Sequence, residues 1–141
     1  MNQKLKKAFR SEAVYEILLD KSIAASGPFD GGCLIFAKAL IMIAGGTLVR
    51  ITSDANDWQT EHYGAKIGEF IYDGDGRHKD GKSWINCFAK NEMITPSERE
   101  RKLDYAEGYD SDSEIPDDAH ASKLLASVLI KKGVQPSLLL Q

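Results

Sequence analysis

The sequence predicts a single α+β domain in which a buried core helix packs on a small antiparallel sheet. Three observations predict it: helical patterns at both ends of the chain, one helical pattern that is apolar nearly all round, and two strand patterns separated by a tight turn. Strands joined by a tight turn pair antiparallel, and a helix that is apolar all round is covered on every side. The length of 141 residues suits one domain, residues 1–141, with flanking N- and C-terminal helices.

The first half of the chain begins with two predicted helices. In residues 4–24, apolar side chains recur mainly at steps of three and four residues with charged side chains between them, which is typical of an amphipathic helix. The Ser-Gly-Pro run at 26–28 ends this helix. A second helix should begin at Asp30 or Gly31 and extend to Ile43. Because it is apolar nearly all round, we expect it to be the central core helix.

Three strands are predicted after the core helix. Residues 47–52 are rich in aliphatic and β-branched side chains and are followed by a polar loop. Residues 62–67 and 69–73 form a predicted hairpin, with Gly68-Glu69 as its tight turn. The Asp-Gly-Asp-Gly run at 73–76 ends the hairpin.

The second half of the chain has weaker patterns. Residues 83–93 and 95–103 have spacings compatible with short helices. Residues 103–122 contain seven acidic side chains and no Lys or Arg, which predicts a solvent-facing segment that is partly loop. A last helix should be capped by the aspartate at 117 or 118 and end at Gly133.

The composition argues against several classes of function. With 18 basic and 21 acidic side chains, the net charge of −3 gives no overall attraction to nucleic acid. The longest apolar run, residues 34–48, contains Lys38 and two glycines and is too short for a membrane span of about 20 residues. The N-terminus lacks the apolar region of a secretory signal. We therefore expect a cytoplasmic protein without a nucleic-acid or membrane partner, whose cysteines, Cys33 and Cys87, are free thiols.

No metal or cofactor site is predicted. The Asp-Gly-Asp-Gly run at 73–76 resembles the start of a calcium loop, but His78 occupies the sixth position, where an EF-hand needs glycine, and Trp84 the twelfth. The cysteines and histidines lack the paired spacing of a zinc site. We expect Cys87 in the core, and His78 and His120 at the surface beside charged neighbours.

The informative feature is the order of Cys33, His62 and Asp73. Cys33 lies just inside a predicted helix start, where unpaired N–H groups favour the thiolate that a cysteine nucleophile needs. His62 begins one strand and would take the thiol proton and later protonate the leaving group. Asp73 ends the next strand and would orient the imidazole, with Asp75 as the alternative. A turn at 68–69 brings these strand ends together, provided that the register puts both side chains on one face.

Four further residues are expected around this site. Gly31 and Gly32 would let a substrate carbonyl approach the backbone, where the N–H of Cys33 would face a developing oxyanion. Trp58 and Tyr63 would line the binding cleft, although aromatic side chains beside strands more often serve packing.

The runs Gly-Gly-Cys-Leu-Ile-Phe-Ala-Lys-Ala-Leu at 31–40 and His-Tyr-Gly-Ala-Lys-Ile-Gly-Glu-Phe-Ile-Tyr-Asp-Gly-Asp-Gly at 62–76 resemble the core of small papain-like and transglutaminase-like cysteine proteins. In that superfamily the cysteine begins a core helix on an antiparallel sheet, and the histidine and an acidic or amide residue lie on neighbouring strands. The resemblance covers residues 26–76 and extends to domains common in phage genomes and bacterial toxin systems. It therefore implies a papain-like fold for this chain.

Two functional hypotheses follow from the resemblance. The first is a cysteine-dependent hydrolase or acyl transferase that acts on an amide or thioester of a protein or peptide-like substrate, with Cys33 as nucleophile, His62 as base and acid, and Asp73 as orienting carboxylate. Papain-type peptidases also place a glutamine before the cysteine, and this sequence has none between Gln3 and Gln59. The second hypothesis is therefore a non-catalytic binding protein of the same fold, such as a phage-type inhibitor of a host defence or toxin protein, that uses its acidic surface.

Overall fold

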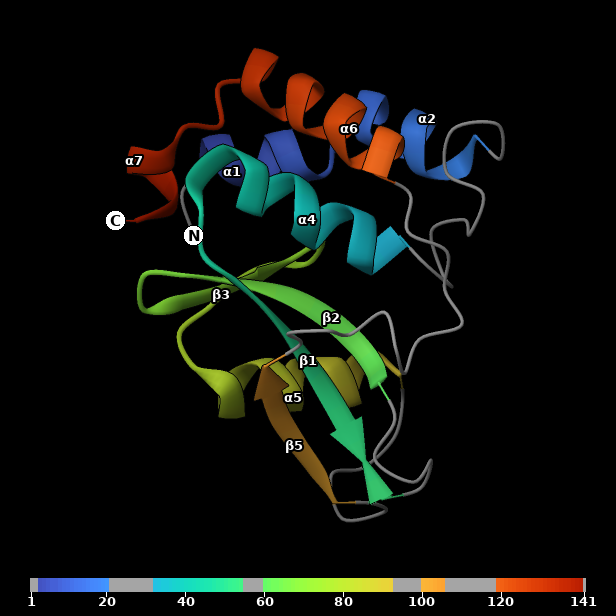
Figure 1. Ribbon diagram of the computed structural model, residues 1–141, viewed down its shortest axis with the longest axis vertical. Helices are drawn as coiled ribbons and strands as arrows, with labels where there is room; N and C mark the ends of the chain where they lie inside the picture. The colour runs from blue at the N-terminus through green and yellow to red at the C-terminus, as the bar shows by residue number, and fades with distance from the viewer. Residues whose placement is uncertain (1–2, 21–31, 55–59, 93–99, 106–118, 141) are drawn as a thin grey trace.

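The protein is an antiparallel sheet with helices on both faces (Figure 1). The computed structural model describes residues 3–20, 32–54, 60–92, 100–105 and 119–140. Within these residues the arrangement is α+β, as the sequence predicts.

The described helices are α1 (Gln3–Phe9), α2 (Glu12–Leu19), α4 (Gly32–Ala44), α5 (Gly81–Asn91), α6 (Ala119–Lys131) and α7 (Pro136–Leu139). The strands are β1 (Thr47–Ser53), β2 (Thr60–Ile67), β3 (Phe70–Asp73), β4 (Gly76–His78) and β5 (Arg101–Tyr105). They form one antiparallel sheet in the order β4-β3-β2-β1-β5. Figure 1 shows α4 on one face of the sheet, with α1, α2 and α6 beyond it, and α5 on the opposite face.

Helix α4 is the central element of the core, as its apolar composition predicts. One side of the helix packs on β2 and the other on α6, so most of its side chains are buried whichever way they point. Leu34, Ile35 and Leu40 are almost completely inaccessible to water. The described part of this helix begins at Gly32 and ends one residue beyond the predicted Ile43.

The register of the β2–β3 hairpin decides which side chains share a face. Ala65 pairs with Tyr72, so the next positions, Gly64 and Asp73, lie opposite each other. Side chains alternate along a strand, and His62 is two residues from Gly64. His62 and Asp73 therefore lie on one face of the sheet, which is the condition that the sequence left open.

Helix α5 packs on that face of the sheet through Trp84, which is fully buried. Asp80 caps the helix, because its carboxylate accepts a hydrogen bond from the N–H of Ser83 at 2.8 Å. The indole lies directly over Gly64, where an added Cβ would be 2.7 Å from Trp84 Cζ2 and 3.2 Å from Ile71 Cγ2. The missing side chain at Gly64 is thus what allows the indole to reach the sheet.

Gly64→Ala is expected to lower the free energy of unfolding by about 1–3 kcal/mol, the usual cost of an overpacked core. Urea unfolding measures this loss. Gly74→Ala is the matched control, since a Cβ there meets nothing within 4 Å, and it should cost less than about 0.5 kcal/mol. Equal effects of the two substitutions would contradict the role given to Gly64.

The predicted helix over 4–24 is wrong as one continuous element. It is two helices, α1 and α2, separated at Arg10 and Ser11. Ser11 has the extended backbone of an N-cap, with φ −70° and ψ 151°. The apolar spacing continues across the break because both helices bury side chains in the same core, so periodicity alone does not reveal it. Residues 21–31 lie outside the described residues.

The C-terminal half departs further from the sequence prediction. Where the structure describes the predicted helix over 95–103, the chain is instead the edge strand β5, with Leu103 opposite Ile51. Strand β4 and helix α7 were not predicted. The helix predicted over 83–93 is confirmed as α5, which begins two residues earlier. Most of the acidic segment, residues 106–118, lies outside the described residues, and so does the expected cap at 117 or 118.

Candidate cysteine-histidine site

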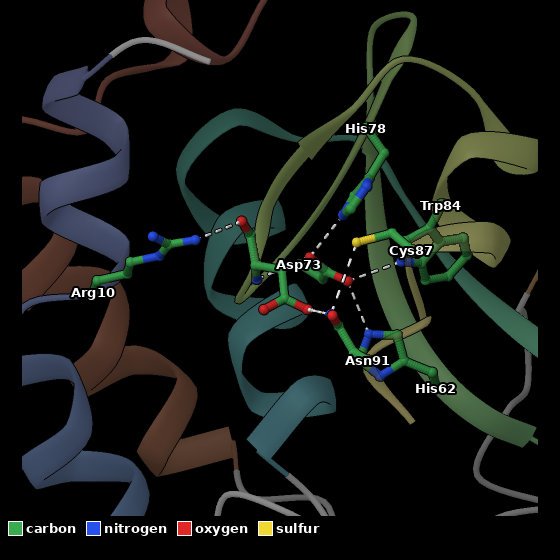
Figure 2. A network of polar contacts seen from close by, with 8 residues as sticks. Arg10, His62, Asp73, His78, Trp84, Cys87 and Asn91 are labelled. Atoms are coloured by element: carbon green, nitrogen blue, oxygen red, sulfur yellow. Dashed lines mark hydrogen bonds and ion pairs between the residues drawn. The ribbon is translucent and has the colours of Figure 1, made fainter. Parts of the chain in front are cut away.

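The site is organised around the buried carboxylate of Asp73, which is 3 % exposed at the end of β3. Its Oδ2 lies 2.9 Å from Nε2 of His62 and accepts a hydrogen bond from Nε1 of Trp84 at 3.0 Å. Its Oδ1 lies 2.9 Å from Nε2 of His78 and accepts a hydrogen bond from the N–H of Asp75 at 3.0 Å. Figure 2 shows His62, His78 and Trp84 converging on Asp73. Because an ionised carboxylate only accepts hydrogen bonds, both imidazoles carry a proton on Nε2.

These contacts shift the pKa values of Asp73 and His62 in opposite directions. Burial by itself raises the pKa of Asp73, but the hydrogen bonds and charges of His62 and His78 outweigh burial and hold that pKa well below its usual range. Burial likewise lowers the pKa of His62, but Asp73 and Cys33 together raise it to about 10. His62 is therefore an imidazolium at neutral pH, held between the carboxylate and the sulfur.

Cys33 lies in the first turn of α4, half-buried, and lines a cavity of about 410 Å³ together with His62. Cys33 is also one of the groups that raise the pKa of His62, which places the sulfur beside the imidazole. Nε2 of His62 faces Asp73, which leaves Nδ1 to exchange a proton with the sulfur. The structure thus brings together the cysteine, the histidine and the aspartate that the sequence singled out.

Aromatic side chains of α5 fix the plane of the His62 ring. Phe88 stacks on the imidazole with ring centroids 4.8 Å apart and an interplanar angle of 15°. The ring centroid of Trp84 lies 5.8 Å from that of His62, with the two rings tilted by 43°. An imidazole stacked on one ring and bonded through Nε2 has little freedom to turn away from Cys33.

The cavity beside Cys33 joins polar and apolar residues. Its polar part is formed by Gly32, His62, Gly74 and Asp75, around the sulfur. The rest is an apolar wall from α1, α2 and α4, formed by Phe9, Val14, Tyr15, Leu18, Leu19 and Phe36.

The other residues expected at the site have different outcomes. Gly32 lines the cavity beside the sulfur. Gly31 and Trp58 lie outside the described residues. The expected place of Tyr63 in the cleft is not observed, because its side chain is 1 % exposed and packs against Leu34. As the neighbour of His62 in a strand, Tyr63 points to the opposite face of the sheet.

Sequence reasoning does not predict the contacts that two residues make with Asp73. Trp84 reaches the carboxylate from helix α5, and nothing in its local sequence indicates this hydrogen bond. His78, expected at the surface, is 8 % exposed and bonded to Asp73. Strand β4 pairs His78 with Ile71, which shares a face with Asp73. A second tight turn, inferred from the glycines around Asp75, would have placed His78 beside Asp73.

Cys87 has surroundings opposite in character to those of Cys33. It is half-buried on α5 rather than in the core, and burial and the charges of Asp75 and Asp73 raise the pKa of its thiol. Asp75, the alternative orienting residue, is bonded elsewhere: its carboxylate accepts a hydrogen bond from Nδ2 of Asn91 at 2.8 Å. The carboxylate that contacts His62 is that of Asp73. Of the two thiols, Cys33 is therefore the one that lies beside a histidine paired with a buried carboxylate.

Within the described residues, no group of three or more His, Cys, Asp or Glu side chains is arranged to hold a metal ion. No helix in the described part of the chain has the length and apolar character that crossing a bilayer requires.

Comparisons of the chain with known protein families, with curated proteins and with solved structures find no match. The geometry of Cys33, His62 and Asp73 is thus the basis on which a function can be assigned.

Proposed function

We propose that the protein is a papain-like cysteine hydrolase or acyl transferase that acts on an amide or thioester through Cys33, His62 and Asp73. One observation carries this proposal: sulfur and imidazole line the same cavity, while the imidazole is bonded through Nε2 to a buried carboxylate. A nucleophile, a base and an orienting group in this order form the minimal apparatus of covalent acyl transfer.

The proposed reaction proceeds through a thioester on Cys33. The thiolate attacks the substrate carbonyl carbon, a C–S bond forms, and the carbonyl oxygen becomes an oxyanion near the N–H of Cys33 at the start of α4. Collapse of this intermediate breaks the bond to the leaving group, which takes the proton from His62. Water or an acceptor nucleophile then attacks the thioester and gives its proton to His62. The acyl group leaves and the thiolate is restored.

Asp73 supports each of these steps through His62. Its carboxylate fixes the tautomer of the imidazole and stabilises the imidazolium that both the resting pair and the leaving-group step require. His78, Trp84 and the N–H of Asp75 hold the carboxylate in place in turn. An orienting group bonded on all sides gives the reacting groups a fixed geometry before the substrate arrives.

The placement of the three residues supports the papain-like assignment. The cysteine begins a core helix, this helix packs on an antiparallel sheet, and the histidine and aspartate lie on adjacent strands. This is the arrangement that the sequence resemblance implies.

The test of the proposed function is the reactivity of the two thiols. At pH 6, iodoacetamide is expected to label Cys33 at least about tenfold faster than Cys87, because an ordinary thiol has little thiolate at that pH. Peptide mass spectrometry after timed quenching gives both rates. Cys33→Ser should remove the fast phase and Cys87→Ser should keep it. Slow and equal labelling of both thiols would contradict the enzyme and favour a binding protein.

A further inference from the structure

We propose that the apolar wall binds the hydrocarbon part of an acyl group, so that the substrate is a thioester of a straight, medium-length aliphatic acid. This inference rests on the proposed function, since the carbonyl of that acyl group must reach Cys33. It adds a substrate class to that function. Its evidence is the apolar wall, which takes no part in the proposed chemistry.

The division of the cavity separates the two ends of such a substrate. The polar residues come from the start of α4, from β2 and from the turn between β3 and β4, where Cys33 and His62 lie. The apolar wall comes from α1, α2 and the second turn of α4. A carbonyl placed at Cys33 therefore has a hydrocarbon surface beside it. The whole cavity has a volume of about 410 Å³, which suits a small-molecule ligand.

The helical origin of the wall favours an alkyl chain over a peptide. Backbone N–H and C=O groups within a helix are bonded to one another, so this wall has few partners for the amides of a bound main chain. A peptide laid along it would lose the hydration of its own amides without replacement. An alkyl chain has no such groups and gains only from burial.

Two large side chains at the outer edge of the wall are exposed to solvent, and a bound alkyl chain would cover them. Tyr15 is 48 % and Leu19 is 61 % exposed, whereas Val14 and Leu18 beneath them are buried. Large apolar side chains that continue from solvent to a nucleophile are typical of a binding surface. The wall therefore includes both residues exposed at the molecular surface and, in Phe36, a residue one helical turn from Cys33.

The covalent step with such a substrate is balanced by groups already present. The thiolate of Cys33 attacks the acyl carbonyl and forms a new thioester, the C–S bond of the substrate breaks, and the departing thiol takes the proton of His62. Water then attacks the acyl-enzyme and gives one proton to His62. A carboxylic acid leaves, and the thiolate and imidazolium are restored.

The inference can be tested with thioesters of N-acetylcysteamine that carry acetyl, butyryl, hexanoyl or octanoyl groups. We expect kcat/KM to rise about twofold per added methylene, roughly sixtyfold from acetyl to octanoyl, because the exposed edge of the wall permits only part of the gain of full burial. Mass spectrometry of the intact protein, with Cys33→Ser as the blank, should show the acyl group on Cys33.

A matched pair of variants separates the wall from the rest of the surface. Leu19→Glu should lower the octanoyl-to-acetyl ratio of kcat/KM about tenfold, because it places a charge beside the chain. Ile130→Glu on α6 is the control, since Ile130 is 55 % exposed and is not part of the wall. Both substitutions affect exposed side chains, so both variants should fold. The control should keep the ratio of the natural chain.

The outcomes distinguish this inference from the proposed function. Rates that do not depend on chain length, or equal effects of the two variants, would overturn the acyl-chain inference alone. The same holds if a peptide amide with a leucine side chain is cleaved faster than the octanoyl thioester. If no thioester acylates Cys33 although iodoacetamide labels it rapidly, the acyl-chain inference is wrong. If labelling is slow as well, the proposed function fails with it.

Discussion

Replacing His62 by glutamine is expected to slow the alkylation of Cys33 at pH 6 by about 100-fold. The imidazolium, whose pKa Asp73 and Cys33 raise to about 10, places a positive charge beside the sulfur in the natural protein, and a neighbouring positive charge is what activates a cysteine nucleophile. Glutamine is neutral, and an ordinary thiol with a pKa of about 8.5 is only about 0.3 % ionised at pH 6. Stopped-flow alkylation with quantification of the Cys33 peptide measures the rate.

The pH profile separates loss of the ion pair from loss of the fold. In the natural protein the rate should change little between about pH 6 and 9, because His62 stays protonated until the pH approaches about 10. In the glutamine variant it should rise about tenfold per pH unit up to about pH 8 and level off above the ordinary thiol pKa of about 8.5, so that the two proteins differ less than about tenfold at pH 9.5. His120→Gln changes an exposed histidine on α6 and is the control. An unchanged rate at pH 6 in His62→Gln would show that the sulfur does not depend on the imidazole.

Asp73→Ala is expected to lower the free energy of unfolding by about 3–5 kcal/mol. The substitution removes the acceptor for two imidazoles, one indole and one backbone N–H, and among these donors those of His78 and Trp84 are buried. Donors left buried without an acceptor lose their hydration without compensation. The urea midpoint should fall by about 2 M. Asp104→Ala removes a carboxylate of which 53 % is exposed and which pairs with Arg50. It should cost at most about 1 kcal/mol.

The effect of Asp73→Ala should depend on pH with a definite sign. The folded pKa of Asp73 is lowered, so its contribution is present above the unfolded value of about 3.9 and is lost as the pH falls towards the folded value. The folded pKa of His62 is raised, so its contribution is complete below about 6.5 and is lost as the pH rises through about 10. The stability difference should therefore be largest between about pH 4 and 6.5. A difference that stays constant from pH 2 to 10 would contradict the ion-pair interpretation.

The elements that the sequence predicts best are those whose local residue pattern is compatible with a single secondary structure. The apolar run of α4 and the hairpin with Gly68 at its turn, where φ is 61°, fold as expected because helix burial and turn geometry determine them locally. The break between α1 and α2 is different, since Arg10 and Ser11 fit within a helical spacing. Strands β4 and β5 are short and carry few apolar residues, so they depend on pairing with distant strands rather than on their own sequence.

In the candidate site, too, the sequence predicts the residues that a local turn brings together but not those that arrive from distant elements. Chain order and one inferred turn placed Cys33, His62 and Asp73 within reach of one another. The partners that hold Asp73 come from β4 and α5, and their positions depend on how these elements pack. Tyr63 shows the opposite error, a residue predicted in the site that lies in the core. Its neighbour His62 is in the site, yet the alternation of a strand turns Tyr63 into the core.

Helix α4 and the sheet carry the reactive groups, whereas most of the apolar wall belongs to α1 and α2, and α2 packs on α6. If the proposed function and the acyl-chain inference hold, reaction chemistry and chain-length selection reside in separate substructures. Since one uninterrupted stretch, Gln3–Leu19, supplies nearly all of the wall, a graft of that helical pair would retarget the scaffold and leave its proton-transfer machinery intact.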